Sequence, residues 1–288
     1  MSRLDVRKTS KLFIGGAFPR SESGRTSVVT TADGEFAANV ARASRKDARD
    51  AVEAAHRARP GWWSRTGYNR GQVLYRVAEM LEGRREQVVA EVLAAEGGSR
   101  RSALAQVDAA VDRWVWYAGW ADKLAQVLGS TNPVAGPFLD LSIPEPTGVV
   151  AVIAPHRSSF LGLVSVLAPV VVSGNAAVTV ASQRRPLPAM TLAEVLATSD
   201  LPGGVVNVLT GEVAEILPWL ASHTGVDGLD LTGVPDAELA ADAERAGAEN
   251  LKRILRPPAS EPRWTDRPDL ERMSAFTEIK TVWHPVGL

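Results

Sequence analysis

The chain contains no cysteine among its 288 residues. This absence excludes disulfides, thiolate zinc sites, iron–sulfur clusters and a cysteine nucleophile. An excess of charge of one sign is missing too, because 32 Lys and Arg face 33 Asp and Glu, for a formal net charge of −1. We therefore expect no nucleic-acid partner and no binding to an anionic membrane surface.

Long apolar runs are also missing. The most apolar run, from Phe160 to Val172, contains Pro169 and is followed at once by Ser173-Gly174-Asn175. It is shorter than the roughly 18 unbroken apolar residues of a membrane span, so it predicts a buried helix. The stretch from Met1 to Ser10 is charged and lacks the apolar core of a secretory leader. The expectation is a cytoplasmic protein.

Several motifs that carry chemistry are absent. The turn where a G-x-G-x-x-G motif would stand reads Ala-Pro-His-Arg-Ser-Ser-Phe over 154–160, and there is no P-loop. No G-x-S-x-G elbow occurs, and none of the four histidines has a second histidine at metal-ligand spacing. We expect no metal site. A serine hydrolase using Ser158 or Ser159 beside His156 is a minor alternative, because such loop serines usually cap a helix.

What is present is typical of a globular protein, with 45% hydrophobic and 23% charged residues. Residues 1–129 predict an extended N-terminal segment followed by helices. Apolar residues recur every three or four positions around 47–56, 74–81, 88–93 and 107–128. The last pattern predicts one long helix. Its aromatic residues (Trp114, Trp116, Tyr117 and Trp120) allow a ligand box, but core and interface packing is the favoured interpretation.

Residues 147–255 alternate strands with helices. Apolar, β-branched runs over 149–153, 177–180, 205–209, 228–231 and 251–255 are separated by helical patterns over 160–172, 190–198, 213–222 and 236–246. This alternation predicts an α/β fold, with a Rossmann-like parallel sheet that carries helices on both faces.

Two further strands lie outside this pattern. Residues 138–146, within the segment 130–146, alternate with period two, and so do residues 276–283 within the terminal segment 273–288. The stretch 256–272, which includes Arg-Pro-Pro-Ala-Ser-Glu-Pro, reads as a linker. A lone C-terminal strand needs a sheet to join.

The ordered motifs resemble the aldehyde dehydrogenase superfamily. The similarity begins at Phe-Ile-Gly-Gly (13–16) and continues through Tyr-Ala-Gly-Trp-Ala (117–121) and Glu-Pro-Thr-Gly-Val-Val (145–150). It then includes Leu-Pro-Gly-Gly-Val-Val-Asn-Val-Leu-Thr-Gly (201–211) and Leu-Thr-Gly (231–233). The resemblance stops near Glu249 and resumes at 276–283, which looks like the family's C-terminal oligomerisation strand. It implies a nucleotide-binding domain and a small β oligomerisation sheet, with the catalytic domain between them missing.

The departures from the family pattern fall at functional positions. The resemblance implies that His156 and Arg157 replace the tryptophan–asparagine pair, that Val180 replaces a ribose-binding lysine and that Gln183 replaces a glutamate. After Thr232 and Gly233, Val234 replaces a serine near the pyrophosphate. Only Glu249 matches a catalytic residue, the general base. Lost donors weaken ligand binding, so no cofactor is expected, although weak NAD(P) binding stays open.

The resemblance implies a non-catalytic subunit, because the family's oligomerisation sheet packs against the catalytic domain of a partner. We expect a hetero-oligomer with a full-length, active aldehyde dehydrogenase paralogue, for which this chain acts as scaffold, stabiliser or regulator. The alternative is a nucleotide-binding sensor module. The expected interface residues are apolar positions of the two outer strands: Leu139, Leu141, Ile143, Phe276, Ile279, Val282 and Trp283.

Overall fold

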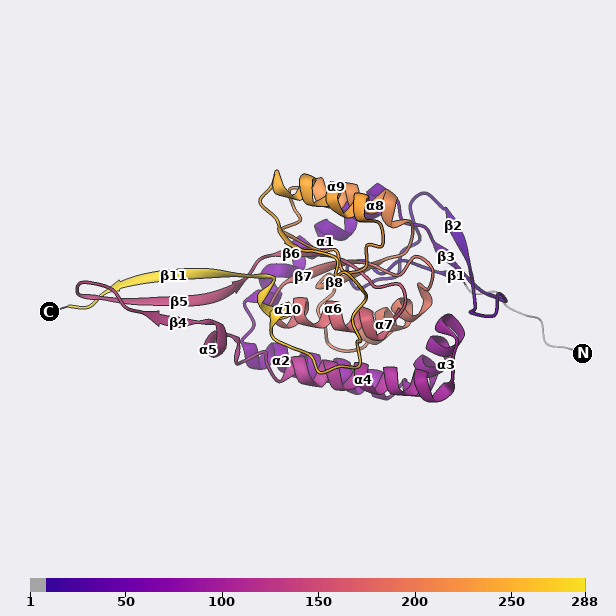
Figure 1. Ribbon diagram of the computed structural model, residues 1–288, viewed down its shortest axis with the longest axis horizontal. Coiled ribbons are helices and arrows are strands. Elements are labelled where there is room, and N and C mark those ends of the chain that lie inside the picture. Colours follow the sequence, from indigo (N-terminus) through magenta and orange to yellow (C-terminus); the bar gives the residue numbers. More distant parts are fainter. Residues whose placement is uncertain (1–8, 288) are drawn as a thin grey trace, which may run out of the picture.

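A five-stranded parallel sheet forms the centre of the molecule. The computed structural model describes residues 9–287, and its ribbon is drawn in Figure 1. The strands lie in the order β10-β9-β6-β7-β8. Their bounds are β6 (Val149–Ile153), β7 (Ala176–Val180), β8 (Val206–Leu209), β9 (Gly228–Asp230) and β10 (Arg253–Leu255). All four pairings are parallel, so the predicted Rossmann-like α/β fold is confirmed.

Helices cover both faces of this sheet. Alternate residues of β6 point into two separate cores, Val149, Ala151 and Ile153 into one and Val150 and Val152 into the other. The first core is closed by α1 (Arg45–Trp63), α8 (Val213–Ser222) and α9 (Ala237–Ala248). The second core is closed by α6 (Leu161–Val172) and α7 (Leu187–Ala197), with α2 (Gly67–Glu82), α3 (Arg85–Glu96) and α4 (Arg100–Ala118) outside them.

The most apolar segment is helix α6, as expected. Every residue from Leu161 to Val172 is buried, and the helix packs between the sheet and α4. Such a helix needs no amphipathic pattern because it has no solvent-facing side. Within residues 9–287, no helix is both long and apolar enough to cross a membrane.

The single long helix expected over 107–128 is wrong. Helix α4 ends at Ala118, Gly119 caps it, and the short helix α5 (Leu124–Leu128) follows after a turn. The turn allows close packing against the start of α2, where a Cβ on Gly67 would lie 2.4 Å from the Ala121 carbonyl oxygen. The periodic pattern persists across the turn because both pieces face the same core.

The aromatic residues of α4 pack in the core, as we favoured. Trp114 and Tyr117 are 0% and 1% exposed. Trp116 lies against Trp120, with ring centroids 5.6 Å apart. The pattern therefore reflects packing rather than a stack of rings open to a ligand.

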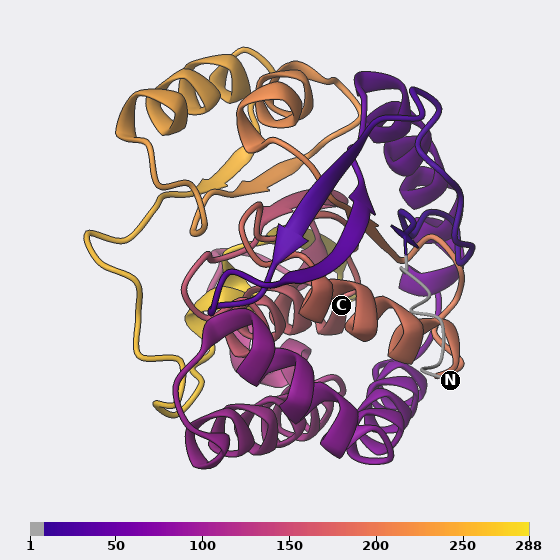
Figure 2. The same cartoon turned by 90° about the vertical axis from the view of Figure 1, so that its right-hand side faces the viewer.

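The N-terminal region contains a sheet that the sequence analysis missed. Its strands are β1 (Thr9–Ser10), β2 (Thr26–Thr30) and β3 (Phe36–Ala41), in the order β1-β3-β2. The β2–β3 hairpin crosses the end of the molecule in Figure 2. Phe13 ties this region to the main sheet through two backbone hydrogen bonds with Val208, of 2.9 and 2.7 Å. These strands have only two, five and six residues, so each leaves little local pattern.

The two outer strands pair with each other. Strand β5 (Phe138–Pro146) is antiparallel to β11 (Thr277–Pro285) along its whole length, and β4 (Ser130–Asn132) lies on its other side. This three-stranded sheet, hereafter the arm, projects away from the body (Figure 1). It leaves the main sheet at the amino ends of the parallel strands, because only Thr147 and Gly148 separate Pro146 from β6.

The segment expected to be a linker is packed against the body. Residues 256–270, hereafter the strap, run along one side of the molecule from β10 to the short helix α10 (Glu271–Ser274), as Figure 2 shows in gold. Trp264 in the strap is 7% exposed and Met273 in α10 is fully buried. Arg113 of α4 donates hydrogen bonds to the carbonyl oxygens of Trp264 and Asp266, at 2.5 and 2.8 Å. The strap therefore has fixed contacts of its own.

Candidate functional site

A cleft lies at the carboxyl ends of the parallel strands, opposite the arm. Its volume is about 590 Å³. The loops that follow β6, β7 and β9 form one wall, and residues 257–261 of the strap form the other. Crevices in this position are where open α/β sheets bind their ligands. We therefore expect the predicted site residues to line this cleft.

Six of the eight predicted catalytic and cofactor positions line this cleft: His156, Arg157, Gln183, Thr232, Gly233 and Val234. The other two do not. Val180 ends β7 and is fully buried in the core beneath the cleft. Glu249 is exposed at the C-terminal end of α9, and its side chain forms no hydrogen bond or ion pair within residues 9–287. The match to the general base thus lies outside the cleft.

Glu261 is a functional position that the sequence analysis missed. Its carboxylate accepts hydrogen bonds from the backbone N–H groups of Arg157 and Ser158, at 3.2 and 3.0 Å, and from Trp264 Nε1 at 3.0 Å. These N–H groups stand just before α6, where the positive end of a helix favours an anion. The strap therefore places a carboxylate on donors that an anionic ligand would use. A proline-rich stretch reads as a linker, so nothing in the sequence pattern marked this contact.

A second carboxylate occupies the neighbouring donors. Glu96, at the end of α3, accepts from both the backbone N–H and the hydroxyl of Ser159, at 2.6 and 2.7 Å. The Ser158 hydroxyl donates to Gln106 at 3.0 Å. Neither serine contacts His156, so the serine hydrolase alternative lacks the nucleophile–base pair that it requires.

His156 instead contacts a serine that is buried. Its Nδ1 lies 3.2 Å from the hydroxyl oxygen of Ser182, which is 1% exposed. Burial lowers the pKa of His156, and the nearby Arg184 and Arg185 lower it further, against the opposing effect of Glu261. The ring is thus held neutral. A serine enclosed in this way has no room for a substrate carbonyl.

Other polar groups of the cleft are used internally. The Gln183 side-chain amide donates to Glu212. Thr232 accepts at its hydroxyl oxygen from Arg272, at 3.3 Å. The backbone at Gly233 is packed so closely that a Cβ there would lie 2.1 Å from the Ala154 carbonyl oxygen. Few donors are left to face a ligand.

The predicted interface residues do not share one face of the arm. Cross-strand partners lie on the same face of a sheet, and the register pairs Val282 with Leu141 and Ile279 with Pro144. Leu139, Leu141, Ile143 and Val282 therefore form one aliphatic face. Ile279 and Trp283 lie on the opposite face, where Trp283 packs on Phe138 with ring centroids 5.7 Å apart.

Phe276 is a correction to the interface prediction. It precedes β11, is 1% exposed and packs in the core of its own chain. Its carbonyl oxygen accepts hydrogen bonds from Asn175 Nδ2 and from the backbone N–H of Thr147, at 2.9 and 3.2 Å. The residue anchors the base of the arm and is not free to contact another chain.

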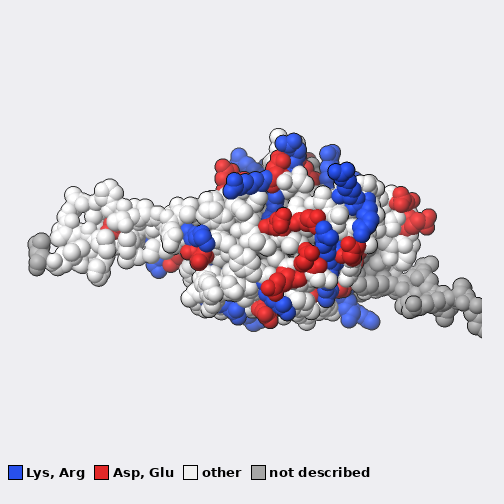
Figure 3. Space-filling view, turned by 90° about the horizontal axis from the view of Figure 1, so that it is seen from below, with Lys and Arg blue, Asp and Glu red and all other residues white. Residues whose placement is uncertain are grey.

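Both faces of the arm are open to solvent. Leu139, Val282 and Trp283 are 41%, 40% and 57% exposed. Figure 3 shows few charged side chains on the outer part of the arm, in contrast to the body. Ion pairs gather at its base, where Lys280 meets Glu145 at 3.2 Å and Arg253 meets Glu278. The arm thus offers apolar surface beyond a charged base.

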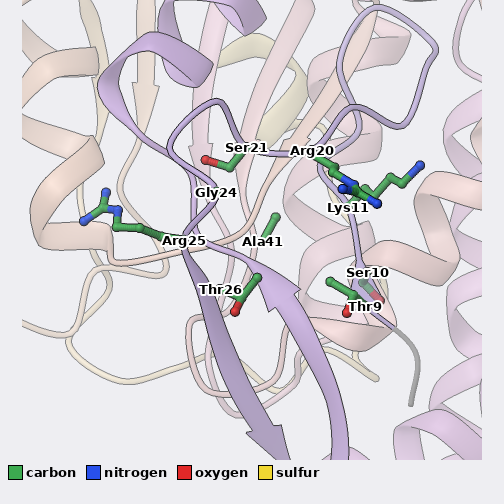
Figure 4. A pocket seen from close by; sticks show the side chains of 9 residues that line it. All are labelled: Thr9, Ser10, Lys11, Arg20, Ser21, Gly24, Arg25, Thr26 and Ala41. Carbon is green, nitrogen blue, oxygen red and sulfur yellow. The ribbon is translucent and has the colours of Figure 1, made fainter. Parts of the chain in front are cut away.

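A second cavity, of about 350 Å³, lies beside the N-terminal sheet (Figure 4). Lys11 and Arg20 extend to one side of it and Arg25 to the other. Arg25 is paired with Glu215 at 3.3 Å. None of the predicted site residues lines this cavity. Among the described residues, no three His, Asp or Glu side chains lie close enough together to hold a metal ion.

Comparison with known proteins identifies the family. Residues 18–256 match the model of the aldehyde dehydrogenase family. The chain belongs to this family. It is 32% identical over 253 residues to retinal dehydrogenase 2 of Homo sapiens, which covers 86% of this chain and 48% of that protein. It is equally similar to retinal dehydrogenase 2 of Gallus gallus, over 257 residues.

Solved structures agree with this assignment. The NAD⁺ complex of an aldehyde dehydrogenase from Bacillus cereus superposes with a TM-score of 0.80 and 25% identity, over 86% of this chain and 50% of that chain. The chain spans about half the length of the curated relatives it matches. It is a shortened, cysteine-free member of the aldehyde dehydrogenase family.

The cleft of this aldehyde dehydrogenase relative does not fit a dinucleotide well. Val180 is buried and Val234 is apolar, so neither donates to a ribose or a phosphate. Glu261 already accepts from the N–H groups of Arg157 and Ser158. A phosphate placed there would meet a carboxylate instead of free donors, and like charges repel.

Proposed function

We propose that the chain is a non-catalytic aldehyde dehydrogenase-like subunit that associates through its arm with a full-length, active aldehyde dehydrogenase. It would act there as scaffold, stabiliser or regulator. The observation that carries the proposal is the arm, which exposes an aliphatic face and an aromatic face beyond a charged base. Exposed apolar patches and sheet edges mark surfaces that bind partners.

The absence of catalysis is supported by the residues of the site. The 288 residues include no cysteine. Glu249 lies away from the cleft, and a general base must be within hydrogen-bond reach of the proton that it removes. The relatives are enzymes, so the loss concerns this chain and not the fold.

The choice of partner rests on the connection between β10 and β11. In this chain the strap and α10 make that connection directly. The family resemblance implies a catalytic domain at this point of the chain, and it implies that this domain receives the arm of a partner subunit. Two copies of this chain could not supply that surface to each other, because the arm would have no matching receptor. A full-length aldehyde dehydrogenase would supply it.

Native mass spectrometry of a tagged copy, purified gently from its own cells, tests the proposal. We expect a full-length aldehyde dehydrogenase, identified by its mass and peptides, at fixed stoichiometry. Recovery of this chain alone, as a monomer or a closed homo-oligomer, would refute the proposal.

Matched variants locate the contact. Leu139→Glu with Val282→Glu places two charges on the aliphatic face of the arm and should abolish co-purification, because an unpaired charge in an interface is costly. Val28→Glu is the control, since Val28 is 66% exposed on the N-terminal hairpin, away from the arm. Loss of the partner in both variants, or in neither, would argue against the arm.

A nucleotide-binding sensor is the second candidate. The observation in its favour is that Arg157 and Arg184 line the cleft and are exposed, so positive charge is available for an anion. The competing carboxylate of Glu261 disfavours it. A calorimetric titration with NAD⁺ and NADP⁺ separates the two functions.

A further inference from the structure

The strap closes a third cavity, separate from the cleft and from the cavity beside the N-terminal sheet. Its volume is about 310 Å³, and it shares no lining residue with the cleft. Arg113 and Tyr117 reach it from α4, Arg272 from α10, and residues 262–269 of the strap form the remaining wall. Cavities of this size are large enough for a small organic ligand.

Arg113 carries a buried charge without a counter-ion. The residue is 7% exposed and forms no ion pair within the described part of the chain. Its Nη2 donates only to carbonyl oxygens of the strap, and its Nε has no hydrogen-bond partner. Burial lowers the pKa of Arg113, but guanidinium stays protonated at physiological pH. Buried charges are normally paired, whereas Asp269 and Asp266 act on this guanidinium only from beyond ion-pair distance.

Tyr117 adds a hydrogen-bond donor at the cavity. The residue is 1% exposed, and its hydroxyl makes no hydrogen bond within residues 9–287. Burial is the main cause that raises the pKa of Tyr117, so the phenol keeps its proton. Tyr117 lines the cavity, so its O–H group can donate to a molecule bound there.

The other charges at the cavity are paired or lie on its exposed rim, which also carries Arg267 and Glu271. Arg272 lies 3.2 Å from the buried carboxylate of Asp230, and its guanidinium lies 5.2 Å from the centroid of the Trp264 ring. Asp266, on the exposed rim, pairs with Arg263 at 3.3 Å. Asp269, also on the rim, accepts from the Glu271 backbone N–H at 3.1 Å. One buried positive charge is left over, that of Arg113.

We propose that this cavity binds a small organic monocarboxylate, whose two oxygens accept from Arg113 and Tyr117. A single negative charge matches the one uncompensated guanidinium. A dianion such as a phosphate monoester would bring an extra charge next to the acidic rim. A water molecule would accept from Tyr117 but would leave the charge of Arg113 unpaired. The site depends on the strap and is independent of the proposed subunit role.

Benzoate, with the uncharged isostere benzamide as control, is the probe that tests the site on the full chain. Isothermal titration calorimetry should show saturable benzoate binding, and the melting temperature should rise with benzoate concentration because the ligand binds only the folded state. Benzamide should do neither. Absence of benzoate binding up to tens of millimolar, or equal binding of benzamide, overturns the proposal.

Tyr117→Phe is the variant that tests the donor, since it removes one oxygen and keeps the buried ring. We expect benzoate affinity to fall about tenfold, as for one lost hydrogen bond to a charged group. Tyr68→Phe, at a tyrosine that is 63% exposed on α2, should bind as the unchanged chain does. Unaltered affinity of Tyr117→Phe, or a crystal structure grown with benzoate that shows only water beside Tyr117, also overturns the proposal.

Discussion

Among the titratable residues that line the cleft, His156 has a pKa that its surroundings clearly shift. Burial, together with Arg184 and Arg185, lowers its pKa below the ordinary value of 6.5. Between the lowered pKa and 6.5 the unfolded chain binds a proton that the folded chain does not. Stability contributed by this residue is therefore present above pH 6.5 and is lost as the pH falls through the lowered pKa.

This sign leads to a prediction for the variant His156→Gln. Urea unfolding at pH 7.5 and 5.5 should show a smaller loss of stability at the lower pH for the variant than for the unchanged chain. His284→Gln, which alters an exposed histidine of the arm, is the control and should keep the original loss. A variant that loses as much stability as the unchanged chain would show that His156 does not carry the proton linkage.

At the scale of elements, the strap is the segment that contributes to both the cleft and the cavity lined by Arg113 and Tyr117. The strap packs against the body through one large side chain, that of Trp264. This residue is 7% exposed and lies beside Gly162 of α6. Arg113 holds the strap backbone at that residue and at Asp266, two positions later. The strap in turn supplies Glu261 to the cleft and forms one wall of the third cavity, which Arg113 and Tyr117 also line.

Trp264→Ala should lower the free energy of unfolding by about 3–5 kcal/mol, the usual cost of truncating a buried tryptophan. Trp283→Ala should cost about 1 kcal/mol or less, since Trp283 is 57% exposed and packs mainly on Phe138. Urea denaturation measures both values. Limited trypsin digestion after Arg263 should also be faster in Trp264→Ala. Equal stability of the two variants would mean that the strap is not anchored through Trp264.

At the scale of the whole molecule, the cleft and the arm lie at opposite ends of the parallel strands. The cleft lies at the carboxyl ends of the parallel strands and the arm leaves from their amino ends. A change in one region can therefore leave the other intact. This separation is compatible with the proposed function, in which cofactor contacts at the cleft are lost and the arm contacts a partner.

A calorimetric titration of the purified chain with NAD⁺ tests whether the cleft binds this cofactor. We expect no saturable heat up to about 1 mM, which corresponds to a binding free energy weaker than about −4 kcal/mol. The reason is that Glu261 occupies the N–H groups of Arg157 and Ser158, while Val180 and Val234 donate nothing. Glu261→Gln removes the competing charge and tests whether the strap alone prevents binding. Micromolar affinity in the unchanged chain would favour the sensor function.

The sequence by itself determined the family, the parallel sheet and the two strands of the arm. Continuous β-branched runs and period-two alternation arise from local burial, so they can be read without knowing any distant contact. The absence of cysteine needs no structure at all. The six cleft residues followed from matching positions in an ordered set of motifs.

Only the tertiary structure decided which distant groups meet. Glu261 reaches the start of α6 across 103 residues of chain, and Arg113 meets the strap across 151. Residues 256–262, with three prolines, have no regular pattern, so nothing local predicted that the strap would pack. The division of the interface residues over two faces of the arm, and the burial of Phe276, likewise depend on strand register. Register and long-range contacts arise from three-dimensional packing, which local sequence patterns do not encode.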